Sequence, residues 1–537
     1  MAAMARMASF RLTATVGYAV LTTYLRPATK LALHLRDETG AKVAARVSVT
    51  DDAGRFYAPE GAWIYADDGY DRSEQKFESH YFYCDGDGTV TLPEGAGVHV
   101  AAVSGYERAL PKITVIQSGA VSEARVEFPA KWKFDDGDGQ WVSADLHVHM
   151  NYGGEYKNTP AHLVTQARGE DLRVVNDLIV NKEQRFPDIR YSGKQLDPAS
   201  TAETEVVHGQ EFHTSYWGHR GVLDIREHIL LPGYAGYPNT AAASLYPMNA
   251  DVYDMGHAQG AMIGAVHPFD EMPDPFATPA PKLTDELPVD VALGKLDYME
   301  IVGFSDHKTT AAVWYKLLNL GFRLPAGAGT DATANYAAPI RGQVGFDRVY
   351  LHLADGEGVT PEAWMAALKA GRTFATNGPL LRFTLGTKQP GDSLSFDAAQ
   401  NSVAYHAELR SAAPVDHLEI VCNGEVAETL KLDETRMSAD VNGTLPVNES
   451  GWCVLRAWSD KATYPVMDSY AYATTSPIYL SVGGAKAKSP SDANYFAAWI
   501  ERAIETTSNY PDWNSAEEKD GVLRKLREAR AIYEKLE

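Results

Sequence analysis

The chain has 537 residues, of which 45% are hydrophobic and 22% charged, and its formal net charge is −22. At roughly 150 residues per domain, this length predicts three or four folded units instead of a single core. The composition excludes extensive disorder. Because no basic stripe offsets the negative charge, we expect no nucleic-acid partner and no attraction to anionic lipid surfaces.

Residues 1–29 contain the stretch FRLTATVGYAVLTTYL, which is too short and too rich in threonine to span a bilayer. A degenerate export signal, a leading strand and a frayed tail all stay open for this segment. The three cysteines, Cys84, Cys422 and Cys453, are too few for a disulfide framework. Cys422 and Cys453 either pair across a β-sandwich or are two buried free thiols. Cytoplasmic and exported locations both stay open, as does the oligomeric state.

Residues 30–130 alternate apolar and polar side chains in short runs separated by Gly, Asp and Pro, as in KLALHLRDETGAKVAARVSV. This alternation predicts strands that bury one face. We therefore expect a small antiparallel β-sandwich, which is similar to the prealbumin-like domains appended to many enzymes.

Residues 141–378 change to short apolar strands that alternate with helical stretches such as NTPAHLVTQARGED and TPEAWMAALKAG. Pro160 suits the first position of the first of these helices. Repeated strand–helix units with apolar strands predict a parallel α/β sheet, and seven or eight units in about 240 residues predict a closed barrel. In such barrels the chemistry gathers at the carboxyl ends of the strands.

Strand alternation returns over 379–485, for example in VDHLEIVCNGEVAETLKL, and predicts a second β-sandwich. Residues 486–537 have helical periodicity with Glu and Lys on the outer faces. We expect a helical hairpin packed on the body.

His147 and His149 stand one residue apart in the strand-like stretch SADLHVH. Residues two apart on a strand point to the same face, so the two imidazoles lie side by side. Such a pair makes half of a metal site, although paired histidines also occur without a metal. The assignment therefore depends on further ligands.

Polar residues able to bind a metal recur where later strands end, in VVHGQEFHTSYWGH, MIGAVHPFD, DYMEIVGFSDH and PAGAGTD. A core position there would be apolar. Singly, His267 is also explained as a turn residue before proline, and Asp331 as a helix cap or turn residue. The residues in question are Glu211, His213, His219, His267, Glu300, Asp306, His307 and Asp331.

The motifs DLHVH, GQEF, HPFD and GTD, in this order, resemble the PHP superfamily of metallohydrolases. Within it, the phrases SADLHVHMNYGG, NKEQR, GFDRVY and GRTFATNGPLL are similar to the CehA/McbA-type branch. The resemblance covers about 141–390. It implies a distorted (β/α)7 barrel, flanked here by the two expected sandwiches, that holds divalent ions.

The ligands implied by the resemblance form two sets that share the carboxylate of Glu211. The first set is His147, His149, Glu211 and Asp331, and the second is Glu211, His219 and His267. The family's third metal position is not matched, because VVNDLIVNKEQR replaces its usual Asp-His and Thr333 replaces its last histidine. We therefore expect one or two ions, and ligands without cysteine suit zinc, manganese or iron.

Two further residues are expected to take part in the reaction. Lys182 would supply positive charge where the third ion is missing, although a solvated loop lysine explains it equally. His213 shares the face of Glu211 and would orient it or carry a proton, whereas Glu300 is an alternative ligand.

These residues predict a metal-dependent hydrolase, in which a hydroxide held by the metals attacks an ester, amide, carbamate or phosphoester bond of a small molecule. The alternative is a non-catalytic carbohydrate- or surface-binding protein that uses the metal-binding barrel as a scaffold. The presence of all six ligand positions favours the hydrolase.

Overall fold

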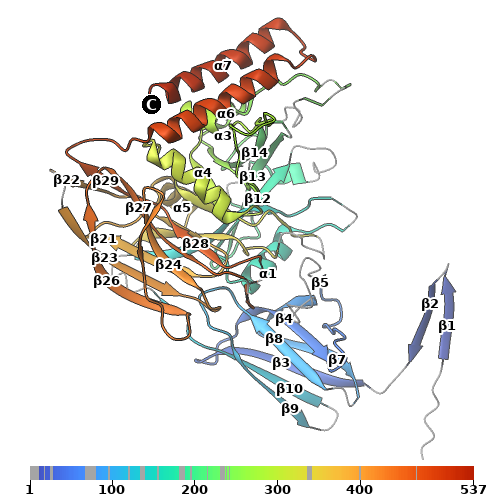
Figure 1. Cartoon of the computed structure of the whole chain (residues 1–537). Helices are drawn as coiled ribbons and strands as arrows, with labels where there is room; N and C mark the ends of the chain where they lie inside the picture. Colours follow the sequence, from blue (N-terminus) through green and yellow to red (C-terminus); the bar gives the residue numbers. More distant parts are fainter. Residues whose placement is uncertain are drawn as a thin grey trace, which may run out of the picture.

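The computed structural model of the chain combines helices and β-sheets in a mixed α/β fold (Figure 1). It describes residues 11–16, 19–24, 28–66, 80–94, 97–118, 121–133, 139–153, 156–180, 188–193, 196–214, 216–229, 236–237, 239–240, 242–335, 342–397, 401–461, 463–466 and 468–537.

Two four-stranded sheets near the N-terminus enclose one apolar cluster. Leu31, Leu33 and Leu35 are fully buried and alternate with more exposed residues, as a strand with one buried face requires. Not every strand pair is antiparallel as expected: β3 and β10 are parallel, which is possible because they are far apart in the chain. In order, the sheets are β7 (Asp87–Pro93), β3 (Ala28–Asp37), β10 (Val121–Phe128), β9 (Lys112–Ser118), and β5 (Tyr65–Ala66), β6 (His80–Asp85), β4 (Ala44–Asp51), β8 (Val98–Val103).

A separate antiparallel pair precedes this unit. It consists of β1 (Arg11–Val16) and β2 (Ala19–Tyr24), which pair with each other.

Seven strands, β11 to β17, then follow one another edge to edge, and the short strand β18 pairs with the first of them. This pairing of β18 with β11, at Val148 and Ala332, brings the last strand segment back beside the first. The strands are β11 (Gly139–His149), β12 (Val174–Val180), β13 (Glu205–Thr214), β14 (Gly218–Leu223), β15 (Met262–Ala265), β16 (Tyr298–Gly303), β17 (Ala326–Gly329) and β18 (Ala332–Thr333).

The expectation of parallel strands throughout is wrong at β14. This strand pairs antiparallel with both β13 and β15 because only a tight turn separates it from β13. The sequence GHRGVL has no continuous apolar run, which is why its pattern did not indicate a strand. The apolar stretch HILL also fits a strand, but its described residues, 228–229, are not in one.

Helices connect and cover these strands. Thr159 caps the first helix by accepting a hydrogen bond from the His162 amide, and Pro160 occupies its first turn as expected. Helix α3 was not predicted, because six residues are too few for a helical period to be recognised. The helices of the described residues are α1 (Pro160–Gly169), α2 (Asn249–His257), α3 (Leu287–Ala292), α4 (His307–Asn319), α5 (Pro361–Lys369), α6 (Pro490–Ser508) and α7 (Ala516–Glu534).

The sheet that contains β11 continues past it into the C-terminal part of the chain. A three-stranded sheet shares a second large apolar cluster with this continuation. The continuation consists of β19 (Arg348–Ala354), β20 (Thr373–Thr376), β28 (Tyr472–Thr475), β27 (Gly451–Trp458), β24 (His417–Cys422) and β25 (Glu425–Thr429), with β29 (Ile478–Val482) and β22 (Ser393–Phe396) beside it. The smaller sheet is β21 (Leu380–Leu385), β23 (Asn401–Arg410) and β26 (Ser438–Val447).

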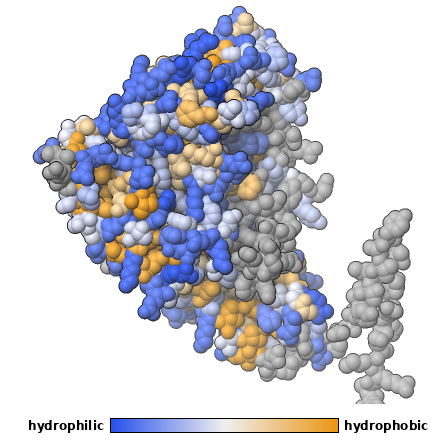
Figure 2. Space-filling model, in the orientation of Figure 1, coloured by the Kyte–Doolittle hydropathy of each residue, from blue (hydrophilic) through white to orange (hydrophobic). Residues whose placement is uncertain are grey.

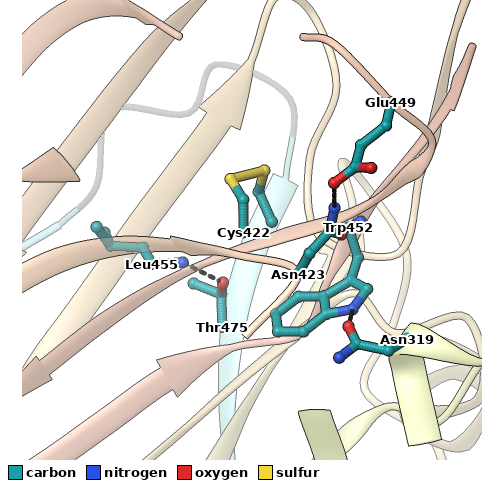
Figure 3. Close-up of a disulfide and its surroundings, with 8 residues drawn as sticks. Asn319, Cys422, Asn423, Glu449, Trp452, Leu455 and Thr475 are labelled. Atoms are coloured by element: carbon teal, nitrogen blue, oxygen red, sulfur yellow. Dashed lines mark hydrogen bonds between the residues drawn. A yellow bond between two sulfur atoms is a disulfide. The ribbon is translucent and has the colours of Figure 1, made fainter. Parts of the chain in front are cut away.

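A disulfide between Cys422 and Cys453 joins β24 to β27, where the two residues are direct partners in the ladder (Figure 3). The neighbouring Trp452 donates from Nε1 to Oδ1 of Asn319, the last residue of α4, at 2.9 Å. The C-terminal sheet is thereby tied to the helix that follows β16.

The surface is largely hydrophilic over α6 and α7, whereas apolar patches lie over the C-terminal sheets and the N-terminal unit (Figure 2). Among the described residues, no helix combines the length and the apolar character needed to cross a membrane.

Candidate metal centre

His147 and His149 form the end of β11, and both side chains are buried. Their Nε2 atoms lie 3.2 Å apart. Nδ1 of His149 lies 2.8 Å from the carbonyl oxygen of Leu178 on β12, which fixes the ring with Nε2 toward His147. The contact with β12 thus determines the direction in which His149 points its Nε2 atom.

Asp331 lies between β17 and β18 and completes this first group. Its Oδ1 is 2.9 Å from Nε2 of His149 and 3.6 Å from Nε2 of His147. The Asp331 amide donates to the carbonyl oxygen of His147 at 2.7 Å. The backbone contact that brings the strand series back to β11 therefore also places this carboxylate.

Glu211, near the end of β13, stands between two groups of histidines. Its Oε2 is 3.3 Å from Nε2 of His149, and 3.8 Å from Nε2 of His147. Its Oε1 is 3.0 Å from Nδ1 of His219, on β14, and 3.4 Å from Nε2 of His267. Each carboxylate oxygen thus faces a different pair of imidazoles.

Two residues of this cluster have backbone angles that non-glycine residues rarely adopt. His267 has a φ of 29° and Asp331 a φ of 56°. Such conformations cost free energy and persist only where the surroundings impose them, often at functional sites. The backbone of Gly329 also lies very close to this cluster, because an added Cβ there would be 2.4 Å from the Cβ of His147.

Glu300, on β16, lies behind the cluster instead of within it. Its Oε2 accepts a hydrogen bond from the His267 amide at 3.0 Å, and its Oε1 lies 3.6 Å from Nδ1 of His147. Because Nε2 of His147 faces Glu211 and Asp331, Glu300 contacts the opposite side of this ring. This position suits an orienting residue better than the alternative ligand that the sequence suggested.

Asp145, on β11, hydrogen-bonds the backbone around this strand end. Its Oδ1 accepts from the amides of His147 and Thr330, and its Oδ2 accepts from the Gly345 amide and the Thr330 hydroxyl. Three of these hydrogen bonds connect β11 to other segments, two to Thr330, which directly precedes Asp331, and one to Gly345. The sequence does not show this role of Asp145, because two of its partners lie 185 and 200 residues away.

The pKa values of the carboxylates in the cluster are lowered, and that of His147 is raised. Burial alone would raise the pKa values of Glu211 and Asp331, but nearby imidazoles hold both pKa values below their usual range: His213 and His219 for Glu211, and His147 for Asp331. Burial would lower the pKa of His147, but Asp331 and Glu300 raise it well above its usual value. The carboxylates are therefore ionised, as ligands of a cation must be.

Access to the cluster is one-sided. The side chains of His219 and His267 are 24% and 14% exposed, whereas those of His147, His149, Glu211 and Asp331 are at most 3% exposed. A molecule from solvent therefore reaches the cluster past His219 and His267.

Of the two residues expected to assist the reaction, the structure describes His213 but not Lys182. His213 pairs with His219 across β13 and β14, and their ring centroids are 3.4 Å apart. Lys182 lies outside the described residues.

The donor set fits divalent ions with nitrogen and oxygen ligands. Three overlapping triads have ligand atoms within 4.8 Å of one another: His147, His267 and Asp331; His147, His149 and Glu211; and Glu211, His219 and His267. Nε2 of His267 is buried and has no hydrogen-bond partner among the described residues. A buried nitrogen of this kind requires a partner, and a metal ion would be one.

Fold and cluster together define a mixed α/β protein with a candidate metal centre. No protein-family model matches the chain, and no curated protein matches it. A solved structure of endonuclease Q, in complex with a 27-mer duplex carrying an abasic lesion, is 17% identical over 43% of this chain and 57% of that chain, with a TM-score of 0.30. The lesion-specific endonuclease Q of Pyrococcus furiosus is 15% identical over 43% and 56%, with a TM-score of 0.28. The chain thus spans little more than half of these endonucleases, and such low scores carry no assignment of fold or activity.

Proposed function

We propose that the chain is a metal-dependent hydrolase of the PHP type, similar to the CehA/McbA branch. This proposal rests on the observation that the two carboxylate oxygens of Glu211 face two separate groups of histidines. In this proposal the strands from β11 to β18 form the PHP-type barrel, and the flanking sheets form the two β-sandwich domains. One ion is held by His147, His149, Glu211 and Asp331, and the other by Glu211, His219 and His267.

When bound, two such ions lower the pKa of a water molecule and polarise the bond to be hydrolysed. The chain's own residues position the ligands: the Leu178 carbonyl oxygen orients His149, and Glu300 orients His147. The partly exposed side of His219 and His267 admits the substrate. His213, packed on the ring of His219, holds or moves a proton beside Glu211.

Lys182 keeps its proposed role of stabilising negative charge in the transition state. Removal of one preorganised donor of this kind costs about 10²–10³ in kcat. Lys182→Met should show this loss with unchanged metal content, while Lys282→Met, in an exposed stretch, should not. Activity of Lys182→Met within a few-fold of wild type would return Lys182 to the role of a loop residue.

The proposed substrate is a small molecule with an ester, amide, carbamate or phosphoester bond. The net charge of −22 supports this choice over a nucleic acid. Both classes enter the test: chromogenic small esters, carbamates and phosphoesters, and duplex DNA with an abasic site.

The experiment combines metal analysis with this screen on wild type, Glu211→Gln and His257→Ala. His257 is the matched control, because it pairs with Asp297 at the end of α2 and contributes nothing to the cluster. We expect turnover of a small ester or amide by wild type and His257→Ala, and none by Glu211→Gln. Metal binding without turnover of any substrate would instead favour the non-catalytic binding protein, and cleavage of DNA alone would contradict the substrate class.

A further inference from the structure

A second group of potential ligands lies outside the six-residue centre. His307 begins α4, Asp347 directly precedes β19, and Asp468 lies in the loop between β27 and β28. One ligand atom from each lies within 4.8 Å of the other two. Nε2 of His307 and Oδ2 of Asp468 are 2.9 Å apart, the same distance that separates His149 from Asp331 in the first centre. The group draws on three segments that are far apart in the sequence.

Two buried polar atoms of this group have no hydrogen-bond partner within the part of the chain that the structure describes. They are Oδ1 of Asp347 and Nδ1 of His307, on side chains of residues that are each 2% exposed. A buried carboxylate oxygen without a partner is costly, so either a proton or a cation must satisfy it.

The acids around Asp347 make this cost larger. Burial raises the pKa of Asp347 well above its usual range, and the charges of Asp468, Asp145 and Glu300 raise it further, while Arg348 opposes them. A bound divalent cation would offset these like charges.

Asn377 keeps the group in place without being free to bind an ion itself. Its Nδ2 donates to Oδ2 of Asp468 at 2.8 Å and to the carbonyl oxygen of Tyr470 at 3.0 Å. Its Oδ1 accepts from the Tyr472 amide at 2.7 Å, which fixes the orientation of the amide group. The Asp468 carboxylate is thereby held toward His307.

We propose that His307, Asp347 and Asp468 form an additional divalent-cation site, which shares no residue with the centre around Glu211. One imidazole and two carboxylates suit Zn²⁺ or Mn²⁺. The side chain of Asp468 is 23% exposed, so an ion can enter from solvent and keep a water ligand. The ion joins the start of α4 and the strand β19 to the loop before β28, and thus fastens the C-terminal sheets to the first strand series.

The test uses the full chain with Glu211→Gln, which takes away the carboxylate that the two ligand sets of the first centre share. After equilibrium dialysis against Zn²⁺ or Mn²⁺, we expect one tightly held ion per chain. Further replacement, Asp347→Asn or Asp468→Asn, should remove this ion. Asp440→Asn is the matched control, because Asp440 pairs with His406 at 2.9 Å in a comparable but exposed pair.

A second readout guards against a folding defect. Addition of Zn²⁺ should raise the Tm of Glu211→Gln, and Asp468→Asn, at a partly exposed position, should abolish this rise while circular dichroism stays native. The proposal is overturned if the folded Asp347→Asn and Asp468→Asn variants keep the ion, or if Glu211→Gln holds none. Failure of the proposed hydrolase would appear differently, as missing turnover in wild type.

Discussion

Glu300 belongs to neither proposed ligand set, yet it contacts members of both, the ring of His147 and the backbone of His267. Residues that orient ligands in this way typically change metal affinity by about 10–100-fold when replaced. We therefore expect Glu300→Gln to weaken zinc binding by about this factor while the number of ions at saturation stays the same.

A competition titration with a chelator measures this affinity. Glu286→Gln is the control, because Glu286 is equally buried but accepts from the amides of Asn249 and Ala250 at the start of α2. Equal affinities of Glu300→Gln and wild type would show that Glu300 does not position the ligands.

Gly329 permits the close approach of β17 to β11. An added Cβ would lie 2.4 Å from the Cβ of His147 and 2.7 Å from Oε1 of Glu300. Overpacking of this kind costs about 1–3 kcal/mol, so we expect Gly329→Ala to lose stability of this order and to bind less metal. Urea unfolding measures the first effect. Gly358→Ala, where an added Cβ meets nothing within 4 Å, should stay within about 0.5 kcal/mol of wild type, and equal losses in both variants would contradict the steric argument.

At the residue level, the sequence could indicate His147 and His149 as neighbouring side chains, because residues two apart on a strand point to the same face. Glu211, His219, His267 and Asp331 followed from their positions at strand ends and from the family resemblance. Glu300 was kept as an alternative ligand because strand position alone cannot show which side of an imidazole a carboxylate contacts. The group of His307, Asp347 and Asp468 could not be predicted, since its members are brought together only by the fold.

At the level of elements, the turn at 188–190 is held to the end of β11 by a titratable contact. Oδ1 of Asp188 accepts a hydrogen bond from Nδ2 of Asn151 at 3.0 Å. Burial, and next the charge of Asp177, raise the pKa of Asp188 to about 7. The folded chain thus binds this proton more tightly than the unfolded chain, where the pKa is about 4. The stability that this proton contributes is present below pH 4 and is lost as the pH rises to about 7.

Asp188→Asn keeps the acceptor for Asn151 and removes the titration. We expect the variant to become more stable relative to wild type by about 1–3 kcal/mol between pH 5 and pH 8. Urea unfolding at both pH values, in a chelator so that metal binding does not contribute, measures this change. A constant difference between the two proteins would show that Asp188 has an ordinary pKa.

The cysteines give a second prediction at this scale. Cys84 is buried, and burial raises the pKa of its thiol to about 12, so it should not react with a thiol reagent in the native chain. Because Cys422 and Cys453 are joined, one thiol should react in denaturant and three after reduction. Three reactive thiols in denaturant without reductant would contradict the disulfide.

Strand β12 was visible in the sequence because five of its seven residues are Val, Leu or Ile, and the structure buries all seven. The antiparallel strand β14 was missed because its six residues include two glycines and no alternation. Strand direction is set by the length of the connection and by the partner strand, and neither appears in a local pattern.

For the whole molecule, the sheet passes without a break through the boundary that the sequence placed between 378 and 379. Strand β20 pairs with β19 on one side and with β28 on the other. Phe374, on β20, is fully buried and belongs to the apolar cluster of the C-terminal sheets. The change in sequence pattern at this point marks a change of topology and not an end of the sheet.

Truncation tests this continuity. A chain of residues 139–378 would expose the edge of β20 and part of the C-terminal cluster, so we expect it to lack a cooperative thermal transition. Residues 139–537 should melt cooperatively. If the shorter chain also melts cooperatively and binds zinc like the longer one, the two parts are independent domains.

The central claim is that Glu211 bridges two metal ions. Anomalous diffraction from crystals of the full chain grown with Zn²⁺, recorded at the zinc absorption edge, tests it most directly. The account predicts two peaks that each lie about 2.0–2.2 Å from a different oxygen of Glu211, one beside His147 and His149 and the other beside His219 and His267. Zinc bound elsewhere in the chain, with no peak at coordination distance from Glu211, would contradict the account.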